Sequence, residues 1–468
     1  MKKIRYREKR CKPLLVKEEV LEDYKIHQEI LNNSLKNIKK DYGMFFTPEH
    51  IVDFMVHLID ANKYTNKEDI NILEPACGLA QFLIGIKKNN PSLFKKAKLF
   101  GVEINQDIIN YLKALNIPDN IQVIREDYLL WQSEILFDLI IGNPPYGIPS
   151  LSDHYAIKID PATKEKYKKH YETWYGKYNV YGAFIEKSIK LLKPDGQLIF
   201  IVPATFMILD EFKKLRTFLA QNGGTAIIYM GPEVFKPDAD VSSVVLNFIK
   251  SDKFAYRLEV MEYLNNKVIP IDVNPKWQGE VIKFKTDYTR ILEDICSYHL
   301  GDIYEIHISP RTPEIKKNHY VTKRALNNSY LPLLNGRNLK CGKIIYNPIT
   351  GYWIKEEDIK NLRKFFDIPH IVVGLGFREK NRVAAAMEEK CYPWMGDVYH
   401  LLRKTNLLNL HFDMKDSEVV EYLNSDYVKK YVKDVYREIT YHLSITQLKN
   451  LPLPNKKEWE EIKRSNLL

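Results

Sequence analysis

The most chemically specific run in the chain is Asn143-Pro144-Pro145-Tyr146, which lies just after an apolar stretch that ends at residue 141. Two consecutive prolines stiffen the backbone and remove two N–H donors, so no neighbouring donor competes for the carbonyl groups. Asn143 adds a side-chain amide oxygen, and Tyr146 adds a flat aromatic face. Rigid acceptors beside an aromatic platform suit a planar amine that is held flat. We therefore take this run as the candidate catalytic motif.

Three acidic residues stand at the ends of successive apolar stretches upstream of that motif. Glu74 opens the small-residue turn 74–80, Glu103 ends the second stretch, and Asp127 follows the third. An acid at the end of the second strand of a doubly wound sheet is placed to accept hydrogen bonds from two ribose hydroxyls. Three acids in register predict an adenosine-containing ligand. The chain has no G-x-x-x-x-G-K-[ST] loop, which favours a nucleoside over a nucleoside triphosphate.

These residues require a scaffold that brings strand ends together. Seven short apolar runs, separated mostly by helical patterns, lie at 70–73, 98–102, 121–124, 137–141, 197–202, 225–229 and 244–249. Strands that alternate with helices need crossover connections, which predict an α/β fold with a doubly wound, mostly parallel sheet. Ligands of such sheets bind at the carboxyl ends of the strands. Upstream, Thr47-Pro48-Glu49 predicts a helix start with Thr47 as the N-cap.

The pattern divides the chain into three parts. Residues 1–45 are polar and Lys-rich, which fits either an amphipathic appendage packed on the main body or a basic arm that touches DNA. The alternation of strands and helices defines a domain over 46–270 and stops after about residue 250, so the boundary lies within 250–285. Residues 271–468 form the second domain. Its segment 311–343 holds eight basic residues and one acid, which predicts a basic face.

The composition excludes several classes of protein. Of 468 residues, 45% are hydrophobic and 28% charged, which rules out collagen-like, mucin-like and wholly disordered chains. The net charge of +10 is consistent with a polyanionic partner but does not prove one. The apolar run 198–209 is too short for a bilayer, which needs about 20 residues, so no membrane partner is expected. Five scattered cysteines without a C-x-x-C pair argue against a metal site and for a reducing, cytoplasmic compartment.

These motifs resemble the class I, S-adenosylmethionine-dependent DNA adenine-N6 methyltransferases. Asn-Pro-Pro-Tyr is similar to the catalytic motif of that family, and Glu-Pro-Ala-Cys-Gly is similar to its cofactor motif. The order of cofactor motif, catalytic motif and recognition region matches the gamma subclass, and the resemblance is closest to its TaqI-like members, from about residue 46 to 452. It implies a Rossmann-like catalytic domain followed by an α+β target-recognition domain.

The resemblance also implies roles for individual residues. Asn143 and Pro144 accept hydrogen bonds from the target amine, and Tyr146 and Phe235 stack on the target base. The implied cofactor-binding residues are Thr47, Glu74, Ala76, Glu103, Ile104, Asp127, Tyr128, Asn143 and Phe184. Arg311 and Arg337 are candidate contacts to guanine or phosphate, although each could equally be a surface ion-pair residue. No metal is implied.

The implied reaction is methyl transfer from S-adenosylmethionine to adenine N6 of double-stranded DNA by base flipping, in 5′-TCGA-3′, within a restriction-modification system. We expect a monomer in the prokaryotic cytoplasm or nucleoid, with any cognate restriction endonuclease acting independently. Two alternatives remain: an RNA adenine methyltransferase, and a protein glutamine methyltransferase, which would resemble the N-terminal half only. The sequence departs from the pattern at Ala80, where relatives usually have glycine, and at Tyr441, where TaqI-like members have a proline before the histidine.

Overall fold

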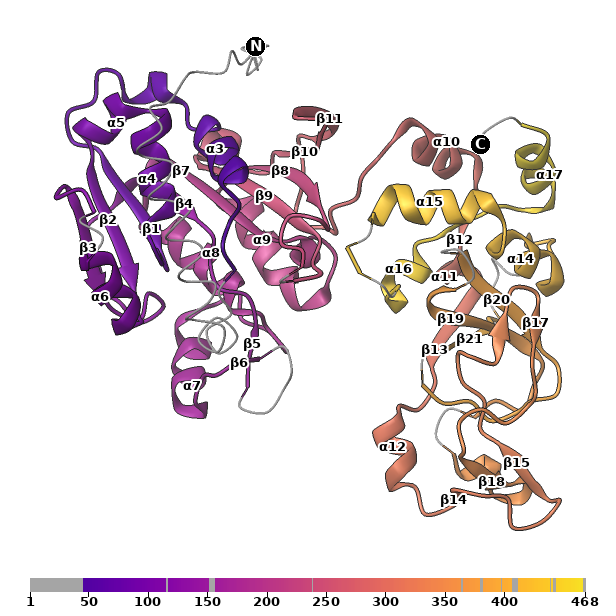
Figure 1. Cartoon of the computed structure of the whole chain (residues 1–468). Helices are drawn as coiled ribbons and strands as arrows, with labels where there is room; N and C mark the ends of the chain where they lie inside the picture. Colours follow the sequence, from indigo (N-terminus) through magenta and orange to yellow (C-terminus); the bar gives the residue numbers. More distant parts are fainter. Residues whose placement is uncertain are drawn as a thin grey trace.

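The computed structural model describes residues 45–465 except 115–116, 151–155, 238, 363–364, 379–381, 397, 406–410, 438 and 441–442. Two lobes lie side by side in Figure 1: one is built on a single large sheet, and the other on smaller sheets and helices. Apart from Phe45, the predicted appendage 1–45 lies outside the described residues, and so do Tyr441 and His442.

A nine-stranded sheet in the order β11-β10-β8-β9-β7-β4-β1-β2-β3 organises the first lobe. Its strands are β1 (Asn71–Pro75), β2 (Lys98–Glu103), β3 (Ile121–Arg125), β4 (Phe137–Gly142), β7 (Leu192–Pro203), β8 (Gly223–Gly231), β9 (Ser243–Lys250), β10 (Leu258–Leu264) and β11 (Lys267–Asn274). Only β9 and β11 run antiparallel to their neighbours. The predicted mostly parallel α/β sheet is confirmed, and all seven predicted runs are strands of it.

The sheet extends further than the apolar pattern indicated. The alternation was expected to stop near residue 250, yet β10 and β11 add a hairpin at the sheet edge. β11 is exposed or half-buried along its whole length, so it lacks the continuous apolar run that marks a buried strand. The sheet therefore ends at Asn274, while the division of the chain at residue 270 stays a prediction.

Helices cover both faces of this sheet. They are α3 (Glu49–His57), α4 (Gln81–Asn89), α5 (Pro91–Lys96), α6 (Gln106–Ala114), α7 (Pro161–His170), α8 (Val180–Leu191) and α9 (Lys213–Asn222). The chain moves from β1 to β2 in one direction along the sheet and from β4 to β7 in the other. Right-handed crossovers therefore place α4 and α8 on opposite faces. The reversal between β1 and β4 is the switch point at which such sheets bind ligands.

The predicted start of α3 is wrong by one residue. The N-cap is Pro48 rather than Thr47, and no side chain caps the helix. The Pro48 carbonyl accepts the backbone N–H groups of Ile51 and Val52 at 2.9 and 3.1 Å. The Thr47 hydroxyl instead accepts a hydrogen bond from Asn143 Nδ2 at 3.1 Å. A side chain that could cap its own helix is thus used to hold a residue of the candidate catalytic motif.

The second lobe has the predicted α+β character. Its main sheet is antiparallel, in the order β13 (Tyr304–Ile308), β21 (Val398–Arg403), β19 (His370–Arg378) and β20 (Arg382–Glu388). A small sheet joins β14 (Val321–Thr322), β18 (Trp353–Lys355) and β15 (Tyr330–Pro332). The remaining two-residue strands are β5 (Ile148–Pro149) and β6 (Ala156–Ile157) in the first lobe, and β12 (Tyr298–His299), β16 (Leu339–Lys340), β17 (Lys343–Ile344) and β22 (Pro452–Leu453) in the second.

The helices of the second lobe are α10 (Asp287–Ile295), α11 (Leu300–Ile303), α12 (Thr312–Lys317), α14 (Asp416–Leu423), α15 (Asp426–Tyr436), α16 (Ile445–Lys449) and α17 (Lys456–Arg464). The extended connector that follows β11 bonds to both lobes. Ile282 N–H donates to the Met207 carbonyl at 2.9 Å, and Phe284 N–H donates to the Val435 carbonyl at 3.1 Å. These bonds tie the second lobe to the first lobe.

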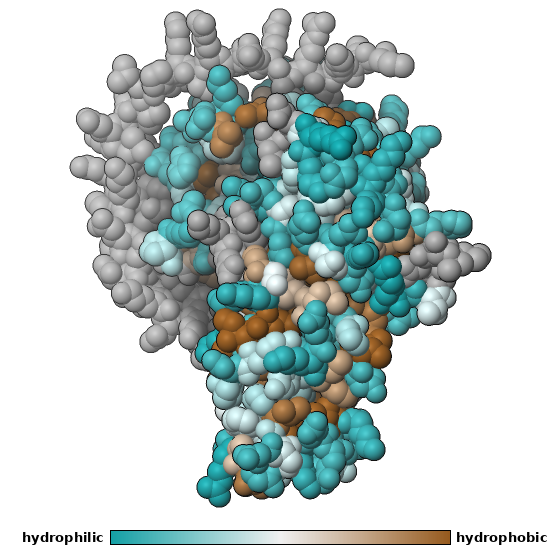
Figure 2. Space-filling view, turned by 90° about the vertical axis from the view of Figure 1, so that its right-hand side faces the viewer, coloured by the Kyte–Doolittle hydropathy of each residue, from teal (hydrophilic) through white to brown (hydrophobic). Residues whose placement is uncertain are grey.

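The face of the second lobe that Figure 2 shows is largely hydrophilic. Figure 2 turns this lobe toward the viewer and shows smaller apolar patches set among hydrophilic side chains. Within the described part of the chain, no helix is both long enough and apolar enough to cross a bilayer.

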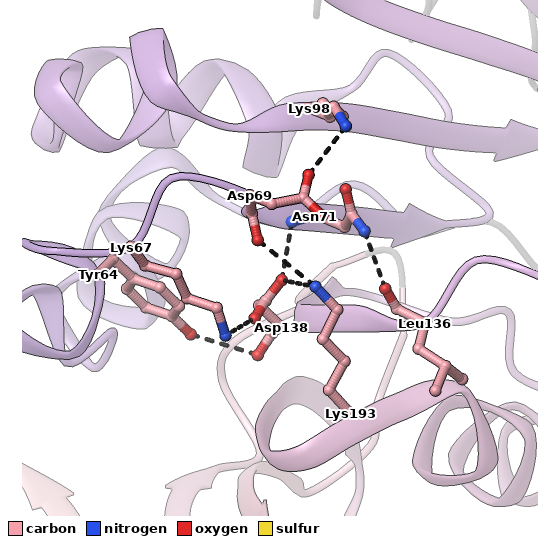
Figure 3. Close-up of polar contacts among 8 residues, drawn as sticks. All are labelled: Tyr64, Lys67, Asp69, Asn71, Lys98, Leu136, Asp138 and Lys193. Carbon is pink, nitrogen blue, oxygen red and sulfur yellow. Dashed lines mark hydrogen bonds and ion pairs between the residues drawn. The ribbon is translucent and has the colours of Figure 1, made fainter.

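A buried carboxylate fixes the amino ends of the two central strands. Asp138 is the second residue of β4, and its side chain is 1% exposed. It accepts Asn71 N–H at 2.9 Å and Lys193 Nζ at 2.8 Å. Lys67 Nζ forms a second ion pair with it. Figure 3 shows these donors converging on the carboxylate from β1, from the segment before β1 and from β7. Burial alone would raise the pKa of Asp138, but these donors more than offset it and lower that pKa.

We expect Asp138→Asn to lower the free energy of unfolding by about 2–3 kcal/mol, because two ammonium groups then lose a buried partner. Folding lowers the pKa of Asp138. The difference in free energy of unfolding between the wild type and Asp138→Asn is therefore fully present above the pKa of the unfolded chain. It disappears as the pH falls through the lower pKa of the folded protein. Urea unfolding at several pH values measures it. Asp69→Asn is the control: its ion pair with Lys98 is 66–69% exposed, so a much smaller change than in Asp138→Asn is expected. Equal effects of the two variants would contradict this account.

Candidate active site

The carboxyl ends of β1 to β4 surround a cavity of about 360 Å³. It is lined by all nine residues that were predicted at the cofactor: Thr47, Glu74, Ala76, Glu103, Ile104, Asp127, Tyr128, Asn143 and Phe184. They meet because parallel strands end at one edge of the sheet, in a register that pairs Glu74 with Gly101 and Glu103 with Arg125. The structure thus gathers these side chains at one site, while the ligand atoms that each one contacts stay a prediction.

The turn between β1 and α4 is built on left-handed backbone. Ala76, Gly78 and Ala80 have φ values of 53°, 52° and 56°. The turn folds back so that the Glu74 carboxylate accepts two backbone N–H groups of the first turn of α4, at 3.1 and 3.3 Å. Left-handed backbone costs an alanine about 1–2 kcal/mol, which explains why glycine is usual at the position of Ala80.

Two buried carboxyl groups lie at the strand ends. Burial raises the pKa of Glu74 to about 8; the two backbone N–H groups lower it in part, and the charge of Glu103 raises it further. Burial also raises the pKa of Glu103, against the N–H groups of Asn105 at 2.9 Å and Gly78 at 3.0 Å. Two desolvated acids in one cavity favour a cationic ligand, because a nearby positive charge stabilises their ionised forms.

The far end of the cavity is aromatic. The rings of Tyr128 and Phe184 lie 4.9 Å apart, inclined by 31°, and the Tyr128 hydroxyl is 2.9 Å from Ser188 Oγ. Asp127 accepts the Tyr167 hydroxyl at 2.7 Å and a backbone N–H at 2.9 Å. Tyr167 comes from α7 and was missed by the sequence analysis, because no strand-end motif marks it.

The lining fits S-adenosylmethionine. The buried carboxyl groups suit a cation with ribose hydroxyls, and the aromatic end suits a flat base. Gln81, which was also missed, lines the cavity 6% exposed, and its Nε2 has no hydrogen-bond partner among the described residues. This donor suits the carboxylate of an amino-acid end group. A cavity of about 360 Å³ is also within the usual range of roughly 300–1,000 Å³ for small-ligand sites.

The Asn143 amide is held in one orientation. Its Nδ2 donates to the Phe45 carbonyl at 2.8 Å and to Thr47 Oγ1 at 3.1 Å, so both N–H bonds are used. Its Oδ1 is buried and has no hydrogen-bond partner within the described part of the chain. Pro144 is buried beside it and has no N–H to offer. The motif therefore presents an open acceptor that a buried polar group would normally not leave unpaired.

Tyr146 and Phe235 are brought together as predicted. Their ring centroids are 5.8 Å apart at 77°, and the Tyr146 hydroxyl donates to the Ile201 carbonyl at 3.0 Å. Phe45 supplies a third ring that the sequence analysis did not foresee, stacked on Tyr146 at 5.4 Å and 25°.

Arg311 and Arg337 lie in the second lobe and do not line the cavity. Arg337 is exposed on a loop that Asn338 stabilises, with Nδ2 donating to the Ile345 and Asn347 carbonyls at 2.6 and 2.8 Å. Among the described residues, no carboxylate forms an ion pair with either guanidinium. The contact that each arginine makes therefore stays a prediction.

The raised pKa of Glu74 predicts a pH effect on the ligand-free protein. The unfolded chain ionises this carboxyl near its ordinary pKa, whereas the folded protein keeps the proton until about pH 8. Wild-type stability relative to Glu74→Gln should therefore fall steadily from about pH 5 to pH 8, by up to a few kcal/mol. Chemical unfolding of both proteins across this range tests it. Parallel curves for the two proteins would show that Glu74 ionises normally.

Comparison with solved structures agrees with this architecture. The protein in the DrdV–DNA complex superposes with a TM-score of 0.57 at 13% identity, over 95% of this chain and 59% of that one. A nuclease-deletion mutant of the Type ISP restriction-modification enzyme LlaGI superposes with a TM-score of 0.54 at 14% identity, over 96% of this chain and 56% of that one. At such identities these structures support the fold alone.

Sequence comparison identifies the family. Residues 24–235 match the Eco57I restriction-modification methylase family, and residues 331–453 match the TaqI-like C-terminal specificity domain. The chain is 39% identical over 429 residues to the Type II methyltransferase M.TthHB8I of Thermus thermophilus, covering 91% of this chain and 94% of that protein. It is 27% identical over 257 residues to the modification methylase CviBIII of Paramecium bursaria Chlorella virus NC1A, covering 54% and 61%. The chain therefore belongs to the type II restriction-modification DNA methyltransferases, whose methyl donor is S-adenosylmethionine.

Proposed function

We propose that this protein methylates adenine at N6 in duplex DNA, in 5′-TCGA-3′, after the base has flipped out of the helix. The observation that carries the proposal is the Asn143 amide, whose donors are bound to the Phe45 carbonyl and Thr47 while its buried Oδ1 stays open. An open acceptor beside the Tyr146 ring suits an exocyclic amine on a flat heterocycle. The resemblance of the motif to adenine-N6 enzymes and of the C-terminal region to TaqI-like enzymes supports the base and the site.

The chemistry follows from what these acceptors do to an amine. An adenine N6 lone pair is delocalised into the ring and is a poor nucleophile. Asn143 Oδ1 and the Pro144 carbonyl accept its two N–H bonds, and these hydrogen bonds strengthen as the nitrogen becomes pyramidal and gains positive charge. That stabilisation is realised mainly in the transition state. Bound S-adenosylmethionine supplies a methyl group already activated by its sulfonium, so a direct displacement needs no strong base and no covalent enzyme intermediate.

The target base must leave the helix to reach a recessed site. Flipping costs a few kcal/mol. Stacking on Tyr146 and Phe235, at about 1–3 kcal/mol for a stacked base, offsets much of it. Both rings are buried, 8% and 4% exposed, so they are already desolvated and fixed in place.

The second lobe is proposed to supply phosphate contacts and base readout. Arg337 lies within the segment that matches a specificity domain, and its guanidinium has no ion-pair partner among the described residues. A guanidinium can bind guanine bidentately or neutralise a phosphate. We expect the protein to act on one strand at a time as a monomer, independently of any cognate restriction endonuclease.

The proposal is tested by incubating plasmid DNA with the purified protein and S-adenosylmethionine, followed by digestion with a TCGA-cutting nuclease. Protection of the plasmid is the expected result. Methyl incorporation into DNA without protection would overturn the recognition sequence alone. If RNA but no duplex DNA accepts the methyl group, the proposed substrate is wrong.

We expect Asn143→Ala to lower the rate of methyl transfer by about 100-fold or more, because one transition-state acceptor is lost. Single-turnover transfer of labelled methyl groups to a TCGA duplex measures it. Asn222→Ala is the matched control, because this asparagine lies outside the cavity and donates only to the Phe218 carbonyl of its own helix. Near wild-type rates for both variants would show that the amide acceptor is not used.

A further inference from the structure

The Tyr146 face that is proposed to stack on the base is covered in this structure. Phe45 lies on it with ring centroids 5.4 Å apart and planes inclined by 25°. Phe45 also approaches Phe235 at 6.0 Å and 52°, while Phe235 meets Tyr146 edge-on at 5.8 Å. The three rings therefore form one closed cluster, in which Phe45 occupies the stacking position and Phe235 borders it.

This cluster leaves no room for a base. A base between two rings needs centroids about 7 Å apart, twice a stacking spacing of about 3.4 Å, and Phe45 and Tyr146 are only 5.4 Å apart. Tyr146 is fixed, since it is 8% exposed and its hydroxyl donates to the Ile201 carbonyl. Phe235 is 4% exposed. Phe45 is only partly buried and lines the open cavity, so it is the ring that can leave.

We propose that the Phe45 side chain is a placeholder for the target base: it occupies the slot in the DNA-free protein and withdraws when a base enters. This inference rests on the proposed function, because it takes Tyr146 as the stacking platform. The backbone of Phe45 has a separate task, since its carbonyl accepts Asn143 Nδ2 at 2.8 Å. Rotation about the Cα–Cβ bond moves the ring to another staggered position and leaves that hydrogen bond in place. The slot can therefore open while the catalytic amide keeps its orientation.

A placeholder makes Phe45 a competitor of every base that enters the slot. Any base that enters must replace the stack of Phe45 on Tyr146, so its net gain from stacking is smaller than on an uncovered ring. A base with a correctly placed exocyclic amine also gains hydrogen bonds to the open Asn143 Oδ1 and to the Pro144 carbonyl. A base without that amine loses the Phe45 stack and gains neither bond. Phe45 therefore raises the cost of entry equally for all bases, and only a base with the amine recovers that cost through these hydrogen bonds.

The test compares equilibrium binding of wild-type protein and Phe45→Ala to three duplexes that differ only at the target position. They carry adenine, hypoxanthine or an abasic site, and S-adenosylhomocysteine is present throughout. An abasic site needs no withdrawal of Phe45, so its affinity is the internal reference. Phe45→Leu, which keeps apolar bulk without a stacking ring, is the second variant. Thermal unfolding and S-adenosylhomocysteine affinity report whether each variant is folded.

In Phe45→Ala, we expect both base-containing duplexes to gain about three- to ten-fold in affinity relative to the abasic duplex, the size of one aromatic pair. Phe45→Leu should shift in the same direction by less. If Phe45 instead grips the flipped base as a second wall, Phe45→Ala loses affinity for the base-containing duplexes, which overturns the proposal. If the affinity for the base-containing duplexes relative to the abasic duplex is the same in Phe45→Ala and in the wild type, the proposal is overturned as well.

A separate readout distinguishes failure of the proposed function from failure of this inference. The wild-type protein should increase the fluorescence of 2-aminopurine at the target position of a TCGA duplex, because a flipped base is unstacked from its neighbours. If it does not, base flipping fails, and the placeholder role fails with it. If the fluorescence rises in the wild type but the affinity ratio does not move in Phe45→Ala, only the placeholder role is wrong.

Discussion

The hydrogen bonds that fix the Asn143 amide govern what the carboxyl edge of the sheet can bind. A free amide could turn over and present either a donor or an acceptor. Here the Phe45 carbonyl and Thr47 hydroxyl take both N–H bonds, at 2.8 and 3.1 Å, so only the oxygen faces the site. The partners come from a segment that precedes β1, 96 and 98 residues away from Asn143 in sequence. A segment far away in sequence thus determines that the Asn143 amide presents its oxygen, and not its nitrogen, to the site.

β4 connects the fixed Asn143 amide to the rest of the first lobe. At the amino end of that strand, Asp138 is buried among Asn71 N–H and two ammonium groups, which ties β4 to β1 and to β7. At the carboxyl end, the strand delivers Asn143 to the switch point between β1 and β4. One end of the strand is therefore fully paired and fixes its position, while the other keeps an unpaired acceptor. The same division of a sheet into a stabilising and a functional end is general in α/β folds.

Much of this arrangement could be predicted from the sequence, for physical reasons. Strands buried on both faces, such as β1 and β4, read as continuous apolar runs. Once the strands are parallel, their terminal acids must meet at one edge, so the three acids of the cavity lining follow from the strand ends, whereas Thr47 and Phe184 were implied by the resemblance alone. What could not be predicted depends on contacts across the chain. Local preference favours Thr47 as a helix cap. The prediction was wrong because Asn143, which binds the Thr47 hydroxyl instead, lies 96 residues away in sequence. Gln81, Tyr167 and Phe45 carry no motif, since they reach the site from helices or a loop.

We propose above all that the open acceptors of the motif hold an adenine N6 amine. The most direct measurement is nucleoside analysis of plasmid DNA after incubation with the protein and S-adenosylmethionine that carries an isotopically labelled methyl group. Enzymatic digestion to nucleosides and mass spectrometry then identify the labelled product. The account predicts that the label appears in N6-methyldeoxyadenosine. Label in N4- or C5-methyldeoxycytidine would contradict it, because a different base would then occupy the slot beside Asn143 and Tyr146.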